Sequence, residues 1–229
     1  MSFTNFNDIA KSKNQMVKIH HVATGNKVEF PGFVTRFEDN YSVSWGSENI
    51  FGRNDPVKPY QGTSRTINIA FTVLSPDMNS AQQNMEKFSL LTKMVYPAYS
   101  APLDGSGGSV GRTIKAPPLL RLSFVNFIQS ADGMGQLLGC IEGVNFAPDF
   151  EPGFFVAQSG EIFPKEFAID FRFNPQHESP LGWEIGATNS FITDTFPYNS
   201  KKPIGGTVSA ESSEGNSSLE SANNDRTLG

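Results

Sequence analysis

The residues whose side chains could do chemistry are few and scattered in this chain. His20 and His21 are adjacent, so their side chains point in different directions and make a poor metal pair without a third ligand. His177 stands beside Glu178 in a turn-forming stretch, where such a pair is more typical of a surface turn than of a catalytic dyad. The chain has no G-x-S-x-G elbow, H-E-x-x-H helix or strand-bound glycine fingerprint. We therefore predict no enzymatic activity, no metal and no cofactor.

Three further stretches with chemical potential have simpler interpretations. Cys140 is the single cysteine and lies in an apolar run, which predicts a buried structural thiol without a disulfide or a thiolate metal site. Asp149 and Glu151 could flank a sugar bond, but any β-rich protein contains such carboxylate pairs. The glycine-rich residues 100–115 follow a predicted helix and lead into a strand, the reverse of a phosphate-binding loop. We interpret them as a flexible connector.

Composition narrows the class of protein. The 229 residues carry a net charge of -5, and the 18 lysines and arginines are scattered, which argues against a nucleic-acid-binding surface. The 20 phenylalanines concentrate the apolar content in large rings and favour a β-dominated core. A leader of charged then apolar residues is lacking, and no apolar run approaches 18 residues, so we expect neither a signal peptide nor membrane insertion.

The elements that must position any site are centred on residues 63–99. Residues 63–74 alternate apolar with polar or small side chains, which predicts a half-buried strand. A helix is predicted over about 76–96, started near Pro76 and stopped by Pro97. Its apolar stripe must be covered, and it consists of Ala81, Met85, Phe88, Leu91 and Val95. The prediction is a mainly β, β-rich α+β domain: an antiparallel barrel or sandwich with one flanking amphipathic helix.

The remaining stretches complete this layout. Residues 28–45 predict a hairpin that turns at Asp39 and Asn40. Two strands are predicted at 118–128 and 136–146, and a last long one at 161–174, where alternation is clean from Phe167 onward. The long loop 46–61 has no regular period, and a loop of this length is usually functional or covered by a partner.

We expect three regions along the chain. Residues 1–27 show no persistent helical or strand period and are predicted to be an N-terminal arm, either frayed or docked on a neighbouring subunit. The β domain is expected to span 28–198. Residues 199–229 are rich in Ser, Gly, Asn and Glu and are predicted to be a polar tail that is disordered in isolation.

A succession of short phrases resembles a known family. It runs FPGFVTRFEDNYSVSW, FGRNDPVKPYQGTSRTINIAFTVLSPD, a helix ending in LLTKMVYPAY, then LLGCIEGVNFAPDFEPGFF and FPKEFAIDFRFNPQHESPLGW. In this order of parts, over residues 28–185, the chain resembles the tail-tube-type proteins of contractile phages (myoviruses). It is most similar to the baseplate hub proteins that act as tail tube initiators.

The resemblance implies a structural virion protein of the phage tail baseplate, assembled in the host cytoplasm. It implies a homo-hexameric ring that joins the central hub to the tail tube, templates tube assembly and lets DNA pass through its lumen without specific binding. The implied partners are the tail tube protein, the baseplate hub proteins, the tape-measure protein and the baseplate wedge. Two alternatives stay open: a tail tube protein or adjacent hub ring of a related contractile injection system, and a carbohydrate-binding β-sandwich.

The same resemblance makes loop 46–61 an inter-subunit or inter-ring contact. We expect the interface residues to be aromatic and charged groups in and beside this loop and in the turn that follows residue 174. They are Trp45, Phe51, Arg53, Asp55, Tyr60, His177 and Trp183. In the carbohydrate-binding alternative, Trp45 and Trp183 would instead stack on a sugar.

Overall fold

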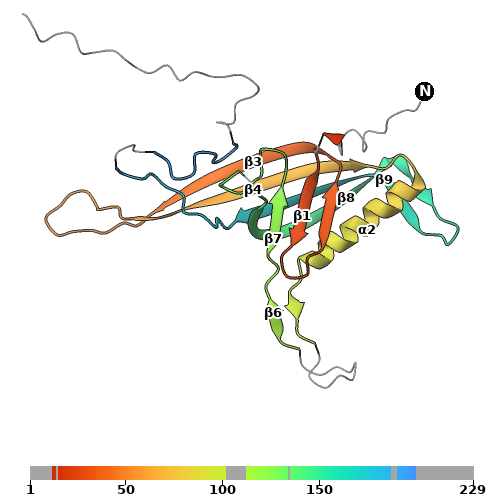
Figure 1. Cartoon of the computed structure of the whole chain (residues 1–229), viewed down its shortest axis with the longest axis horizontal. Helices are drawn as coiled ribbons and strands as arrows, with labels where there is room; N and C mark the ends of the chain where they lie inside the picture. The colour runs from red at the N-terminus through yellow and green to blue at the C-terminus, as the bar shows by residue number, and fades with distance from the viewer. Residues whose placement is uncertain (1–11, 14, 102–111, 134, 187–189, 200–229) are drawn as a thin grey trace, which may run out of the picture.

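Antiparallel strands make up most of the molecule (Figure 1). The computed structural model describes residues 12–13, 15–101, 112–133, 135–186 and 190–199. Seven strands form one sheet in the order β2-β1-β7-β8-β9-β4-β3, and β5 pairs with β6 in a separate two-stranded ribbon. The predicted mainly β fold with one flanking helix is thus confirmed. The strands are β1 (Val17–His21), β2 (Lys27–Phe30), β3 (Gly32–Trp45), β4 (Tyr60–Leu74), β5 (Ala98–Tyr99), β6 (Ile114–Ala116), β7 (Leu120–Ser123), β8 (Leu137–Val156) and β9 (Ile162–Pro175), and the helix is α2 (Met78–Met94).

The centre of the sheet is the pair β4 and β9, and both strands were predicted from their alternation. Ile69 lies opposite Phe171 and Phe71 opposite Ile169, so the apolar sides of the two strands coincide. These side chains face the core, while the alternate residues form a polar surface on the other side of the sheet. The buried apolar core consists of Val17, Ile19, Val28, Phe30, Ile67, Ile69, Phe71, Val73, Leu91, Met94, Leu120, Leu122, Ile128, Leu137, Phe167, Ile169, Phe171 and Phe173.

The sheet curls until its two ends meet at one corner. Its end strands, β2 and β3, are separated by one residue, Pro31, so Phe30 and Gly32 lie within about 7 Å of each other. Across the interior, the rings of Phe30 on β2 and Phe71 on β4 lie 5.7 Å apart. The sheet therefore folds over itself as a barrel-like wall around one core.

Helix α2 packs on β9, β2 and β8 along one side of this wall (Figure 1). Asp77 caps it, because its Oδ1 accepts a hydrogen bond of 2.8 Å from the backbone N–H of Ser80. Of the predicted stripe, Ala81 and Leu91 are buried, while Met85, Phe88 and Val95 are half-buried. The Phe88 ring stacks on Phe146 of β8 with 4.4 Å between ring centroids. The helix and the contact face expected for it are confirmed.

The hairpin turn predicted at Asp39 and Asn40 is wrong. Both residues lie in the middle of β3, a single strand that pairs with β4 from Gly32 to Trp45. Local turn propensity is overridden here because Asp39 finds a buried cationic partner across the ladder, Arg65. The true turn is the loop 46–59, where one bridge joins Glu48 to Val57.

The two strands expected at 118–128 and 136–146 also differ from the structure. β7 ends at Ser123, because Phe124 and Ile128 close a tight turn in which Val125 has a φ of 48°. β8 instead continues past Phe146 to Val156, crossing two register irregularities between Glu142 and Val144 and between Asp149 and Phe154. Bulges of this kind let a strand bend and continue through proline-containing sequence.

We predicted no strand in residues 1–27, and this prediction is wrong for residues 17–21. These form β1, which pairs with both β2 and β7, and it buries Val17, Ile19 and His21. The rest of the expected arm before residue 12, the glycine-rich stretch 102–111 and the tail from residue 200 lie outside the described residues. The three-region division of the chain stays a prediction. In the described part, no helix is long and apolar enough to cross a membrane.

Candidate subunit interface

The β3–β4 hairpin extends beyond the body of the sheet (Figure 1). β9 pairs with β4 only from Ile67 to Leu74, so the outer part of β4, from Tyr60 to Thr66, has β3 as its ladder partner. β3 is itself the end strand of the sheet, so one side of its backbone is unpaired with any described strand. A two-stranded ribbon of this kind is marginal in water without a third layer to cover it.

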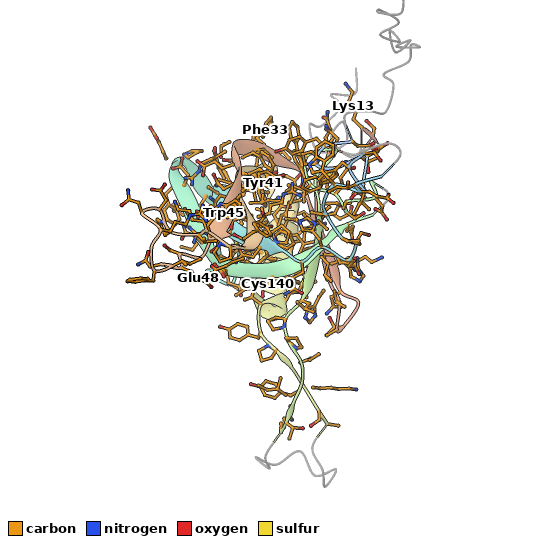
Figure 2. All side chains as sticks on the ribbon, turned by 90° about the vertical axis from the view of Figure 1, so that its left-hand side faces the viewer. Lys13, Phe33, Tyr41, Trp45, Glu48 and Cys140 are labelled. Carbon is orange, nitrogen blue, oxygen red and sulfur yellow. The ribbon has the colours of Figure 1, made fainter. Side chains whose placement is uncertain are left out.

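Exposed apolar side chains gather on the outer part of this hairpin. We call them the hairpin patch: Val43, Trp45, Ile50, Phe51 and Tyr60, with exposed fractions from 49% to 106%. Trp45 and Tyr60 are register partners whose rings meet edge to face at 5.5 Å. Figure 2 turns this end of the molecule toward the viewer and labels Trp45 and Tyr41 on β3. Exposed apolar side chains gathered on one projecting element are typical of a contact site.

The two charged residues predicted at the interface lie in the same loop. Arg53 and Asp55 are both exposed, and the backbone N–H of Arg53 closes a turn onto the carbonyl of Ile50 at 3.1 Å. The loop thus presents both signs of charge around the apolar side chain of Phe51, which is fully exposed. Five of the seven predicted residues lie at the paired ends of β3 and β4 and in the loop between them, namely Trp45, Phe51, Arg53, Asp55 and Tyr60.

A buried ion pair fixes the middle of the hairpin. Arg65 of β4 donates from Nε to Asp39 Oδ1 at 2.9 Å and from Nη2 to Asp39 Oδ2 at 2.7 Å, and both side chains are 3% exposed. Two tyrosines add to it, because Tyr41 and Tyr198 donate to Asp39 Oδ2 at 3.0 and 2.8 Å. The Arg65 guanidinium also lies over the rings of Tyr41 and Phe196, at 5.5 and 5.4 Å. Burial is the main cause that raises the pKa of both tyrosines, so both stay protonated donors.

Residues 190–199, which we call the strap, cover this ion pair. Besides the bond from Tyr198, Thr195 Oγ1 donates to the carbonyl of Ala131 at 2.7 Å, and Asn126 donates to the carbonyl of Tyr198 at 3.4 Å. The ring of Phe196 contacts Tyr41, and the ring of Tyr198 contacts Phe127. The strap therefore covers the apolar side of β3 up to Tyr41 and stops short of the hairpin patch.

His177 lies under the strap and not on a surface turn. It is half-buried, its ring meets Phe196 edge-on at 5.7 Å, and its Nδ1 is buried without a partner in the described residues. Burial lowers the pKa of His177, and the positive charge of Arg65 lowers it further against the opposing effect of Asp39. The interface role expected for His177 stays a prediction, but the side chain is partly covered within its own chain.

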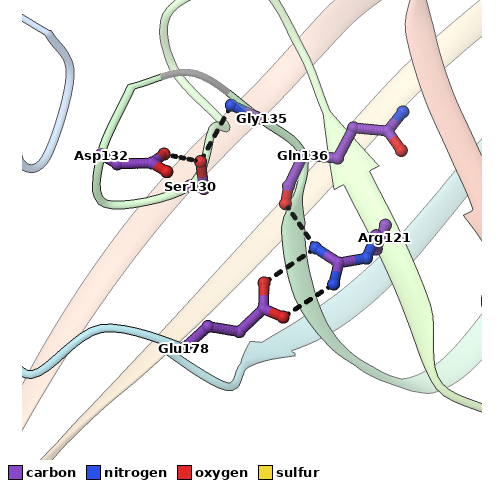
Figure 3. Close-up of polar contacts among 6 residues, drawn as sticks. All are labelled: Arg121, Ser130, Asp132, Gly135, Gln136 and Glu178. Carbon is purple, nitrogen blue, oxygen red and sulfur yellow. Dashed lines mark hydrogen bonds and ion pairs between the residues drawn. The ribbon is translucent and has the colours of Figure 1, made fainter.

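Glu178 turns to a different partner, Arg121 of β7 (Figure 3). The guanidinium donates to both carboxylate oxygens, at 2.8 and 2.7 Å, and its Nη1 also reaches the carbonyl of Gln136 at 3.5 Å. The hydrogen bonds from Arg121 lower the pKa of Glu178. Figure 3 also shows Ser130 bonded to Asp132 and to the backbone of Gly135, which closes the neighbouring turn. His177 and Glu178 therefore do not form a catalytic dyad.

The remaining candidates have structural surroundings. Trp183 is 71% exposed and meets Phe191 of the strap edge-on at 5.6 Å. Cys140 is half-buried rather than buried, with its Sγ 3.9 Å from the carbonyl of Asn174. His21 is buried in β1 and shares a hydrogen bond with Thr24. Among the described residues, no group of three His, Cys, Asp or Glu side chains could hold a metal ion.

The other side of the sheet is polar, and most of its charged side chains are hydrogen-bonded. Arg36 lies 2.9 Å from Glu38, Asn68 donates to Glu38 at 3.2 Å, and Arg172 donates to Asn68 at 3.3 Å. Asp170 accepts from Asn145 at 2.8 Å, and Glu142 lines the same shallow groove. Two arginines thus stand among three carboxylates, which leaves little excess positive charge for phosphates.

Sequence reasoning missed the ion pair and the strap. Asp39 was interpreted as a turn residue, Arg65 was given no role, and the two lie 26 positions apart. The only signal in the sequence was a charged residue, Arg65, in step with the apolar Ile67 and Ile69. That signal places Arg65 on the core side of β4 and requires a buried partner.

Comparisons with known proteins give similarity in structure alone. No protein-family model and no curated protein sequence matches the chain. The structure is similar to the Dit (gp 19.1) protein of phage SPP1, described as a paradigm of the hub adsorption apparatus of phages that infect Gram-positive bacteria, with 10% identity and a TM-score of 0.37. That match covers 70% of this chain, and the chain spans about half, 49%, of the Dit protein. It is also similar to a chain in the tail of an empty gene transfer agent (GTA) particle solved with C6 symmetry, with 9% identity, a TM-score of 0.31, and 73% and 97% of the two chains covered. Neither similarity identifies a function for this chain.

Proposed function

We propose that this protein is a structural subunit of a contractile phage tail, which assembles with copies of itself into a hexameric ring at the baseplate. The ring would connect the central hub to the tail tube, template tube assembly and surround the DNA channel. The hexamer, the tube and hub partners and the location in the virion come from the sequence resemblance over residues 28–185. A tail tube protein or an adjacent hub ring would use the same surfaces.

The observation that carries the assembly part of this proposal is the hairpin patch. Its aromatic side chains lie on a ribbon that projects from the sheet, and they include the fully exposed Phe51. Aromatic anchors surrounded by polar residues are the usual centres of protein interfaces. The unpaired side of β3 adds a backbone edge that another strand can pair with. The hairpin thus offers both apolar area and hydrogen-bonding groups to a neighbouring subunit.

The polar side of the sheet suits the wall of a DNA channel. Its arginines are engaged by Glu38 and Asn68, and Glu142 and Asp170 add negative charge. A wall with few free cations binds phosphates weakly, so a DNA strand can slide along it. The net charge of -5 for the whole chain is in keeping with this surface.

The experiment compares assembly of the purified chain with that of three variants, by light scattering and negative-stain images. We expect the parent chain to form rings alone or with tube protein, and Phe51→Asp to prevent this without lowering the melting temperature. Arg53→Ala should weaken assembly in the same way. The matched control is Tyr96→Asp, because Tyr96 is also exposed, at 66%, but lies after α2 and not on the hairpin. The proposal would be refuted if all variants assembled equally well. It would also be refuted if the parent chain stayed monomeric both alone and with tube protein.

A further inference from the structure

We propose that the strap, residues 190–199, is a reversible cover that limits how much of the hairpin is open to a neighbouring copy. The inference rests on the proposed assembly through the hairpin patch and adds a regulatory step to it. When the strap lifts, the part of the Tyr41 ring that Phe196 covers joins the contact face next to Val43. The chain would then exist in a covered state and in an assembly-competent state.

The carboxylate of Asp39, on which the strap rests, keeps its hydrogen-bond donors without the strap. Arg65 binds Asp39 through two hydrogen bonds, and Tyr41 donates a third to Asp39 Oδ2. All three residues belong to the hairpin itself. Tyr198 contributes one further bond to the same carboxylate, so its departure leaves no unpaired buried charge behind. Lifting the strap therefore does not require the hairpin to unfold.

Three buried polar atoms at the strap have no hydrogen-bond partner among the described residues. Arg65 Nη1 and His177 Nδ1 lie beneath the strap, and Thr193 Oγ1 lies within it, each buried without a partner in the described residues. Buried groups of this kind are costly because they have lost water and gained no hydrogen bond in exchange. Water can reach them when the strap moves away. This hydration favours opening and offsets part of the loss of ring contacts.

The strap itself is held loosely compared with the core. None of its ten residues is fully buried, whereas Ile67, Ile69 and Phe71 of the adjacent β4 are. Side-chain hydrogen bonds hold it to the rest of the chain at Tyr198, Thr195 and Asn126, together with contacts between aromatic rings. Its first residues also pair through backbone hydrogen bonds with the preceding segment, at Gly182 and Glu184. Segments with few buried apolar contacts open at a lower free energy than the sheet that carries them.

Opening would extend the hairpin patch without a gap. Tyr41, Val43 and Trp45 alternate along β3 and therefore project on the same side of the strand. Phe196 of the strap packs against one side of Tyr41, which is 43% exposed, compared with 49% and 56% for Val43 and Trp45. Lifting the strap also uncovers the side of Phe127 that the Tyr198 ring contacts at 6.0 Å; Phe127 is 45% exposed with the strap in place. The occupant of the enlarged face is a second copy of this chain.

A removable disulfide tests the cover directly. A Cβ placed on Gly133 lies 3.2 Å from Thr195 Cβ. The distance between the two Cβ atoms of a disulfide is usually about 3.5–4.5 Å, so a small shift of the strap would allow the bond to form. The variant is Gly133→Cys with Thr195→Cys, in a chain where Cys140→Ser removes the single native thiol. Gly133 has a φ of 70°, so the substitution is strained, but the strain is shared by the oxidised and reduced forms of the same variant.

We expect the oxidised, strapped form to need at least about tenfold more chain than the reduced form to assemble, as followed by light scattering. Equal assembly of the two forms would overturn the cover and leave the proposed function intact. Failure of the native chain to assemble under any condition would overturn both. Hydrogen exchange supplies a readout independent of assembly: the amides of Ile192 and Phe196 should exchange at least tenfold faster than that of Ile69. Equally slow exchange at these three amides would refute the cover alone.

Discussion

Removing Asp39 should destabilise the protein more than removing any exposed charge on the hairpin. Asp39→Ala leaves the Arg65 guanidinium, which is 3% exposed, without its carboxylate partner and beside the rings of Tyr41 and Phe196. Breaking a buried pair from one side costs about 3–5 kcal/mol, because the remaining charge is desolvated and unpaired. For a chain of this length, that loss lowers the melting temperature by about 6–20 °C.

The partner substitution should cost less. Arg65→Met leaves Asp39 with two hydroxyl donors, Tyr41 and Tyr198, so the carboxylate retains part of its hydrogen bonding. The double variant removes both charges together and should cost clearly less than the two single losses combined. The difference, which is the coupling energy of the pair, should be about 2–3 kcal/mol.

The assay is urea unfolding of dilute, unassembled chain, with the slope m checked for constancy across variants. The matched control is the exposed pair on the other side of the same strand, Arg36 and Glu38, whose side chains are 62% and 46% exposed. Substituting Arg36→Ala should cost no more than about 1 kcal/mol. If Asp39→Ala costs no more than Arg36→Ala, or if the two single losses simply add, the buried pair does not fix the hairpin.

Two other predictions follow from single residues. Because burial lowers the pKa of His177 in the folded chain, the unfolded chain binds more protons below pH 6.5, so the free energy of unfolding should fall as the pH drops below that value. His21 has a lowered pKa for the same reason, so His177→Gln should flatten only part of the pH dependence of urea unfolding, and an unchanged slope would contradict the burial of His177. A methyl group on Gly139 would lie 2.3 Å from the carbonyl oxygen of Asn174 and 2.6 Å from Phe173 Cζ, so Gly139→Ala should cost about 1–3 kcal/mol in thermal unfolding. Gly182→Ala, where the added methyl group meets nothing within 4 Å, is its control and should be near neutral.

Strands and helices in which apolar and polar residues alternate with a long, unbroken period could be predicted from the sequence. The alternation of Ile67 to Val73 and of Phe167 to Phe173 correctly identified β4 and β9, because each strand has one side in the core and one in water. The helix was equally clear, since its apolar residues recur at helical spacing between Pro76 and Pro97. These patterns are set by local burial and need no knowledge of distant partners.

Features that depend on distant partners could not be predicted in this way. Asp39 and Asn40 have turn-forming side chains, yet the pairing of β3 with β4 and the ion pair to Arg65 hold them in a strand. β1 was missed because Val17 and Ile19 supply only a short alternation beside two histidines. Residues 190–198 were placed only at the end of the β domain, since their sequence does not indicate that Tyr198 bonds to Asp39.

The candidate interface, too, could be predicted only in part. Loop 46–61 could be identified because its length and its exposed Phe51 need a covering partner. His177 was expected on the surface, but the ring of Phe196 partly covers it. A turn sequence alone does not show which side of the turn another segment will cover.

The most direct test of the proposed role is an image of the assembled particle. Electron microscopy of the purified chain, with and without tube protein, should show rings with six-fold symmetry in which the side chains of Trp45 and Phe51 lie against the adjacent copy. Rings in which the hairpin points freely into solvent would contradict the role of the hairpin patch. A chain that stays monomeric and never joins tube protein would contradict the proposed function as a whole.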